Sequence, residues 1–308
     1  VKELYGIDKI TGGTIEHLNQ EFLKTLKPGH FHKVLKEKSR IKISLLDVAP
    51  VDYAEDVEWD QEFFRKVCRM DKFVNPESIS QIEKIGEDAG FTICSINDYI
   101  SACEITLDKA LAGGAVALKN GLAYTRSLSF ERVPFQEAEM EFNRMLKSKR
   151  NPEWWWNNGL FPNKKFQDYM QHIILNLANK RNLTYCFHTG LHEGTGNLIQ
   201  ESNPVLLSNL FLEYPDITFD LFHIGYPYQL ELSALAKTFP NVMIDMCWAH
   251  IISPTACINA LIEWLDSVPA NKISAFGGDY CLVDGVYGHQ YMARENVSRA
   301  LAHKVKRD

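Results

Sequence analysis

The sequence predicts an α/β protein built as a distorted (β/α)8 TIM barrel, and three observations carry this prediction. Strand-like and helix-like segments alternate from about residue 40 onward, which favours a parallel sheet. The last four predicted strands start at 183, 218, 241 and 273, and these intervals hold one helix and two loops each. Several strands end in a polar residue, as expected at the mouth of a barrel, where its chemistry is done.

Seven segments read as strands: Ile41–Val48, Lys66–Asp71, Ala115–Lys119, Leu183–His188, Thr218–His223, Asn241–Met246 and Ile273–Phe276. Along the later strands, small or polar side chains share one face with the polar tip, and bulky side chains occupy the other face. Apolar stripes at helical spacing separate the strands, and Asn203-Pro204 reads as a helix cap followed by proline. An eight-stranded barrel would need one strand more than these seven.

At 308 residues the chain could form one large barrel or two ordinary domains. The barrel pattern favours one domain over residues 1–308, with a helix and loop inserted at about 130–163 that carries Trp154-Trp-Trp156. The net charge of −6 gives no basic excess, so we expect no nucleic-acid partner. The seven cysteines form no C-x-x-C pair, which favours a reducing, cytoplasmic location. Because no run approaches ~20 apolar residues, we expect no membrane association.

Three strings end an apolar run with a metal-binding residue type: Thr184–His188, Phe219–His223 and Ile273–Asp279. Imidazoles and carboxylates are ligands of divalent transition metals. Glycines accompany all three tips and allow close approach of the backbone to a bound group. We therefore predict that His188, His223 and Asp279 form a common metal site.

A second group of candidates lies at and after the third predicted strand. Lys119 either binds an anionic substrate, is carbamylated and bridges two metals, or forms a local ion pair. Tyr124 and Arg126 follow it, and Arg126 either clamps a substrate carboxylate or pins the 130–163 insertion. We take Arg126, Lys119 and Tyr124 as substrate-binding candidates.

Other polar residues have simpler interpretations. Arg69 and Asp71 share one face of a strand and are expected to form an internal salt bridge. The glycine-rich segment His192–Asn197 can fold over a ligand but lacks the context of a dinucleotide site. We expect His250 and His289 to be ordinary hydrogen-bonded histidines.

The motifs Phe187–Gly190, Phe222–Gly225, Asn241–Trp248 and Phe276–Tyr280 resemble the amidohydrolase superfamily, most closely its amidohydrolase-related branch and more distantly uronate isomerase. The resemblance covers about residues 40–300. It implies a (β/α)8 barrel with one or two divalent metals at its mouth. By this resemblance His188 and His223 match the histidines of strands five and six. Asp279 matches the strand-eight aspartate that binds metal and handles the proton of the attacking water, and Lys119 falls where a bridging lysine lies.

The resemblance fails at the first strand, where the family has a His-x-His pair. The sequence offers only His30-Phe-His32, which leads into a helix-like segment, so we expect it to be a helix start. Either the chain is a piece truncated at both ends, or the barrel is degenerate and its metal site incomplete. We expect weak or absent metal binding. We also expect homo-oligomerisation unless residues Val1–Lys38 cover the open edges.

The resemblance implies metal-dependent hydrolysis of a C–N, ester or lactone bond in a small substrate, and Arg126 suggests that this substrate carries a carboxylate. A divalent ion, expected to be Zn²⁺, would lower the pKa of bound water toward ~7. Asp279 and His223 are the expected catalytic residues. The alternatives are uronate isomerase-like or decarboxylase activity on the same scaffold, and an inactive chain.

Overall fold

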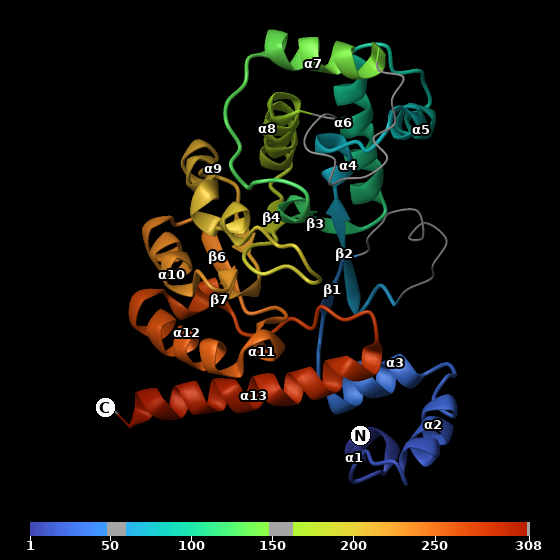
Figure 1. Cartoon of the computed structure of the whole chain (residues 1–308), viewed down its shortest axis with the longest axis vertical. Helices are drawn as coiled ribbons and strands as arrows, with labels where there is room; N and C mark the ends of the chain where they lie inside the picture. Colours follow the sequence, from blue (N-terminus) through green and yellow to red (C-terminus); the bar gives the residue numbers. More distant parts are fainter. Residues whose placement is uncertain (48–59, 148–162, 307–308) are drawn as a thin grey trace.

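A computed structural model describes residues 1–47, 60–147 and 163–306. Within them, seven parallel strands form one open sheet in the order β1 to β7, and this confirms the seven strands expected from the sequence (Figure 1). The strands are β1 (Ser44–Asp47), β2 (Phe64–Arg69), β3 (Ala115–Asn120), β4 (Thr184–Phe187), β5 (Phe219–Leu221), β6 (Val242–Asp245) and β7 (Ile273–Ser274). Every strand therefore points the same way, and all their carboxyl ends share one rim of the sheet.

Helices connect the strands as βα units require. They are α1 (Lys2–Tyr5), α2 (Ile15–Leu23), α3 (His30–His32), α4 (Asp71–Val74), α5 (Ile79–Ala89), α6 (Ile96–Ala112), α7 (Phe135–Lys147), α8 (Lys164–Lys180), α9 (Ser208–Glu213), α10 (Gln229–Thr238), α11 (Ala249–Ile252), α12 (Pro254–Ser267) and α13 (Val283–Val305). A π-helical segment, Lys33–Lys38, continues α3. None of the described helices is both long enough and apolar enough to span a bilayer.

Local signals in the sequence explain where the helices begin. Ser95 caps α6 by accepting the Asp98 N–H, while the Asp98 side chain accepts the Ser95 N–H. Asn163 caps α8 by accepting the Phe166 N–H. The expected Asn203-Pro204 start is confirmed: the Asn203 side chain accepts the Val205 N–H, and a short 3-10 turn leads into α9.

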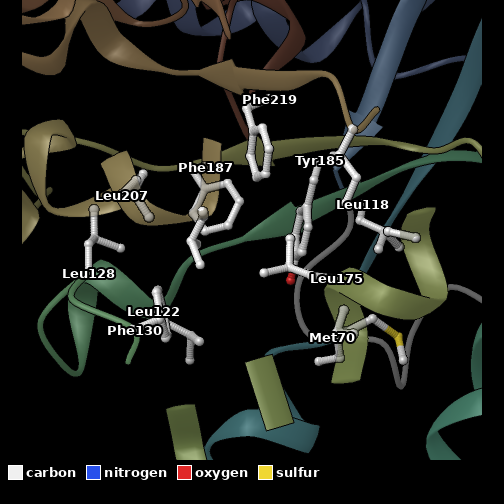
Figure 2. Close-up of a cluster of buried hydrophobic side chains, with 14 of the residues drawn as sticks. Met70, Leu118, Leu122, Leu128, Phe130, Leu175, Tyr185, Phe187, Leu207 and Phe219 are labelled. Atoms are coloured by element: carbon white, nitrogen blue, oxygen red, sulfur yellow. The ribbon is translucent and has the colours of Figure 1, made fainter. Parts of the chain in front are cut away.

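The main core lies between the sheet and its helices (Figure 2). The side chains of Tyr185, Phe187 and Phe219 leave β4 and β5 on the helix side and are fully buried, as their alternation in the sequence predicts. Leu118 of β3 and Leu175 of α8 join them. Burial of each such side chain contributes about 1.5–3 kcal/mol to the free energy of unfolding. This core holds the strand ends in place.

The N-terminal helices pack beside the C-terminal helix α13 (Figure 1). His30 Nε2 lies 2.7 Å from a carboxylate oxygen of Asp284, and Arg294 donates to the carbonyl of Ser39. His30 and His32 are helical, which confirms that the His-x-His string is a helix start. In the expected insertion, residues 135–147 form α7, and the three tryptophans lie outside the described residues.

Candidate functional site

Two imidazoles meet where β4 and β5 end. His188 Nδ1 and His223 Nε2 are 2.9 Å apart, and both side chains are buried. The outer nitrogens face backbone carbonyls: His223 Nδ1 is 2.9 Å from the Cys247 oxygen, and His188 Nε2 is 3.0 Å from the Leu191 oxygen. A carbonyl only accepts, so both outer nitrogens must carry the proton. In neutral rings, the two inner nitrogens therefore face each other with lone pairs.

Facing lone pairs repel unless a cation lies between or beside them. Burial and the neighbouring His223 and Lys119 lower the pKa of His188. Burial and then Lys119 lower the pKa of His223 to about 3. A proton is therefore a poor choice for that cation at neutral pH. Two nitrogens 2.0–2.1 Å from one zinc ion lie roughly 3 Å apart, so the pair fits a shared metal. Metal-bound histidines also commonly donate their second N–H to a carbonyl, as here.

A carboxylate and a thiol complete the candidate metal set. Single ligand atoms of His223, Cys247 and Asp279 all lie within 4.8 Å of one another. Gly277 makes this approach possible, because a β-carbon there would lie 2.6 Å from the Cys247 sulfur. The structure thus places His188 beside His223, and His223 near Asp279. Their shared metal site stays a prediction. The structure adds Cys247, two residues beyond β6, at a position equivalent to the other strand tips.

The loops that carry these residues are held in unusual backbone conformations. His223, Trp248 and Asp279 have φ values of 68°, 62° and 53°, after β5, β6 and β7 respectively. Positive φ in residues other than glycine is strained and concentrates at functional sites. Gly190, with φ of 75°, has no room for a β-carbon against the backbone of Gly225. The glycine after His188 is therefore required to bring the two imidazole loops together.

Burial controls the charge of the neighbouring groups. It raises the pKa of the Cys247 thiol well above its usual value, so the thiol stays protonated unless a metal binds it. Burial also raises the pKa of Asp279, with Lys119 opposing the shift. Lys119 is itself buried, with Nζ 3.6 Å from the centroid of the Phe222 ring, and its pKa is lowered by burial. Lys119 therefore lies at the same rim, and its carbamylation stays a prediction.

A cavity of about 1000 Å³ opens next to Asp279. Among the described residues, its lining comprises Val1, Tyr5, Ile15, Glu16, Leu18, Asn19, Phe22, Asp47, Tyr124, Glu193, Trp248, Ile251, Asp279, Tyr280, Cys281, Leu282, Asp284 and Gly285. Helices α1 and α2 supply one part of this wall, and the strand-end loops supply another. The motifs of the N-terminal segment did not indicate that it reaches the site.

The first two strands contribute an ion pair to the same rim. Arg69 donates Nε and Nη2 to the two carboxylate oxygens of Asp47, at 2.8 and 2.6 Å. The expected Arg69–Asp71 salt bridge is therefore wrong, since Asp71 instead accepts the Gly121 N–H at 3.0 Å. Asp47 ends β1, and its position as a polar strand tip was the available signal.

Tyr124 links the rim to the glycine-rich loop. Its ring stacks on His192 with centroids 4.5 Å apart and lies 4.6 Å from that of His188. The Glu193 N–H donates to the Tyr124 hydroxyl at 3.1 Å. Tyr124 and Glu193 both line the cavity, so this candidate and its loop do reach the site.

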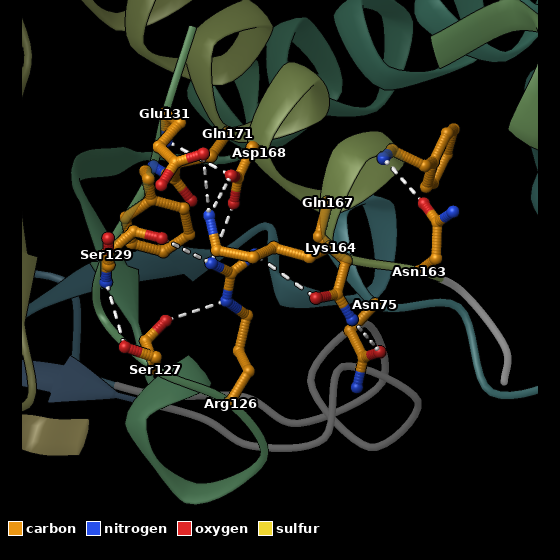
Figure 3. Close-up of polar contacts among 12 residues, drawn as sticks. Asn75, Arg126, Ser127, Ser129, Glu131, Asn163, Lys164, Gln167, Asp168 and Gln171 are labelled. Carbon is orange, nitrogen blue, oxygen red and sulfur yellow. Dashed lines mark hydrogen bonds and ion pairs between the residues drawn. The ribbon is translucent and has the colours of Figure 1, made fainter. Parts of the chain in front are cut away.

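Arg126 is placed differently from its expected substrate-clamping role (Figure 3). Its guanidinium pairs with Asp168 at 2.7 Å and also donates to Gln167 and to the carbonyls of Ser127 and Ser129. Each nitrogen already has a protein partner, and the side chain is 7% exposed. Asp168 of α8 supplies the carboxylate that a substrate was expected to bring. Arg126 therefore has the alternative role, pinning the start of the 130–163 insertion.

The remaining histidine candidates behave as expected. His250 bonds the Ala275 carbonyl and the Asn296 side chain. His289 bonds the Gly278 carbonyl. Both rings tie α11 and α13 to the loop after β7.

Comparisons with known proteins agree with this geometry. The amidohydrolase family pattern matches residues 144–308, which is more than half of the chain. Protein fluG of Emericella nidulans is 34% identical over 116 residues, which cover 36% of this chain and 13% of that protein. The chain thus spans only about an eighth of the length of this curated relative.

Three solved structures share the fold. Uronate isomerase of Thermotoga maritima matches with a TM-score of 0.75 at 16% identity, over 99% of this chain and 71% of that one. Uronate isomerase of Bacillus halodurans matches with 0.71 at 15%, over 99% and 67%. A candidate metal-dependent hydrolase of Lactobacillus casei matches with 0.65 at 19%, over 87% and 68%. With the matched family pattern, the chain belongs to the amidohydrolase family.

Proposed function

We propose that this chain is a metal-dependent hydrolase that acts on a C–N, ester or lactone bond of a small molecule. The observation that carries the proposal is the pair of inner nitrogens of His188 and His223, which face each other 2.9 Å apart while both outer nitrogens are bonded to carbonyls. Family membership supports a hydrolytic reaction, and the cavity beside Asp279 supports a small-molecule substrate.

The residues present fit a divalent metal. His188 and His223 would hold it as neutral ligands, with Asp279 and Cys247 as further donors. Once bound, the ion would supply Lewis acidity and lower the pKa of a bound water. Zn²⁺ suits a nitrogen, oxygen and sulfur donor set.

The protein's own groups have separate tasks. Asp279 lies at the cavity wall with a raised pKa, which suits a group that accepts a proton from water and returns it to a leaving group. The carbonyls of Cys247 and Leu191 fix the two imidazole tautomers. Tyr124 holds the Glu193 loop against the rim, and both residues line the cavity.

The proposal is tested by metal content and turnover measured together. Because Cys247 adds a donor that the sequence did not reveal, we expect tight metal binding in place of the weak or absent binding expected from the sequence. Elemental analysis should find a divalent metal in the purified protein at near-stoichiometric amounts, and chelation should abolish hydrolysis in a panel of amides, esters and lactones. The matched variants are His188→Gln and His192→Gln, since His192 stacks on Tyr124 but lies outside the candidate metal set. Metal retained in His188→Gln, or turnover without metal, would contradict the proposal.

Uronates belong in the same panel. The likeness to uronate isomerases is at 15–16% identity and shows the fold alone. Conversion of a uronate without incorporation of oxygen from water would replace hydrolysis by isomerisation. Protein that binds no metal and turns over none of the panel would favour the inactive alternative.

A further inference from the structure

The charged side chains that line the cavity all have one sign. They are Glu16, Asp47, Glu193, Asp279 and Asp284. No Lys, Arg or His side chain belongs to the lining formed by the described ranges 1–47, 60–147 and 163–306. Lys119 and Arg126, the two cations expected to meet a substrate carboxylate, are both buried and do not line the cavity.

Three of these five carboxylates already interact with other groups or belong to the candidate metal set, and two do not. Asp47 is neutralised by Arg69, and Asp284 is bonded to His30. Asp279 belongs to the candidate metal set. Glu16, on α2, and Glu193, in the loop after β4, have no ion-pair partner among the described residues. Even with a metal bound, the substrate would meet at least these two negative charges.

The rest of the lining is largely apolar and aromatic. Helix α2 contributes Ile15, Leu18 and Phe22, and the strand-end loops contribute Trp248 and Tyr280. Apolar surface binds a hydrophobic body, and aromatic faces attract ammonium groups as well. The same surface offers a carboxylate no Lys, Arg or His side chain, and it presents two negative charges that have no ion-pair partner among the described residues.

We propose that the cavity selects a substrate with an apolar or aromatic body and a protonated amine, and that it disfavours a carboxylate. This rests on the proposed function, because it names the substrate class of the same site. It revises the carboxylate-bearing substrate suggested by Arg126. Helix α2 becomes a specificity element, because its residues Glu16 and Phe22 line the same cavity as Asp279. The candidate metal ligands lie far from this helix in the sequence.

The test measures binding without turnover. Three probes share a phenyl ring and differ in charge: 2-phenylethylamine, 2-phenylethanol and 3-phenylpropionate. Binding is followed by ligand-observed NMR, both with the purified protein and after chelation. We expect the amine to bind about tenfold or more tightly than the carboxylate in both forms, with the alcohol between them and the preference shrinking as salt rises.

Variants locate the effect. Glu16→Gln and Glu193→Gln should each weaken amine binding about three- to tenfold and leave the alcohol unchanged. Glu21→Gln is the matched control, because Glu21 lies on the same helix but outside this cavity, paired with Lys24. It should change nothing.

The outcomes separate this inference from the hydrolase proposal. A carboxylate that binds as well as the amine, no amine binding at about 1 mM, or equal effects of Glu16→Gln and Glu21→Gln would each overturn the inference. Loss of metal-dependent turnover with the amine preference intact would instead remove the hydrolase proposal and leave the selectivity standing.

Discussion

Two polar clusters at the same rim of the sheet use their charges in opposite ways. Around Arg126, a buried guanidinium and the carboxylate of Asp168 neutralise each other, and neighbouring carbonyls and amides take the remaining hydrogen bonds. Around His188 and His223, the rings are neutral, and two lone pairs face each other next to an open cavity. The first cluster is complete without a ligand, whereas the second is complete only with a cation. A polar residue after a strand therefore indicates function only when protein groups leave some of its hydrogen bonds or its charge unsatisfied.

The largest expected difference between the clusters is in activity. Asp279→Asn removes a metal donor and the proton acceptor, so we expect the kcat/KM of the best substrate in the panel to fall by about 10²–10⁴-fold. Asp216→Asn, at an exposed turn before β5, is the control and should leave the rate unchanged. A residual rate within tenfold of the parent would show that Asp279 is not part of the chemistry.

The next effect is in stability and belongs to the other cluster. Asp168→Asn leaves the Arg126 charge buried without its carboxylate, so we expect the free energy of unfolding in urea to fall by about 3–5 kcal/mol. Glu213→Gln breaks the exposed pair with Arg132 and should cost about 0–1 kcal/mol. Equal losses in the two variants would mean that the buried pair is no more important than an exposed one.

The sequence predicted the strands well because parallel strands covered by helices read as apolar runs with polar ends. That pattern sufficed for His188, His223 and Asp279. The pattern could not distinguish Arg126 from these three residues, because Asp168, whose carboxylate pairs with it, lies 42 residues later, on α8. Cys247 and Asp47 were missed because their importance depends on distances across strands. Helix α2 was missed because nothing in its own residues shows that it faces β1 and the loop after β7.

A third expected effect is a dependence of the stability on pH. The unfolded His223 has a pKa of ~6.5, and burial lowers the folded value to about 3. Between these values the unfolded state binds more protons, so stability rises with pH through this window and is constant above it. In chelated protein, we expect the free energy of unfolding of the parent to fall relative to that of His223→Gln. The expected loss is about 1 kcal/mol per pH unit as pH falls from 6.5.

The free energy of unfolding of both proteins is measured in urea at several pH values. The difference between the two values cancels the contribution of the carboxylates that they share. His303→Gln, at an exposed position near the end of α13, is the control and should run parallel to the parent. A constant difference between the parent and His223→Gln from pH 6.5 to 4 would mean that the His223 ring is not held neutral.

The smallest expected effect concerns the loop that joins the clusters to the cavity. Tyr124→Phe keeps the ring stacked on His192 but removes the hydroxyl that accepts the Glu193 N–H. Losing one such bond costs ~0.5–1.5 kcal/mol, so the affinity for 2-phenylethylamine should fall about two- to tenfold. Tyr124→Leu also loses the stacking and should weaken binding further. Tyr291→Phe, exposed on α13, should be neutral. If Tyr124→Phe bound the probe as the parent does, the hydroxyl would not be what positions Glu193, and stacking alone would hold the loop over the cavity.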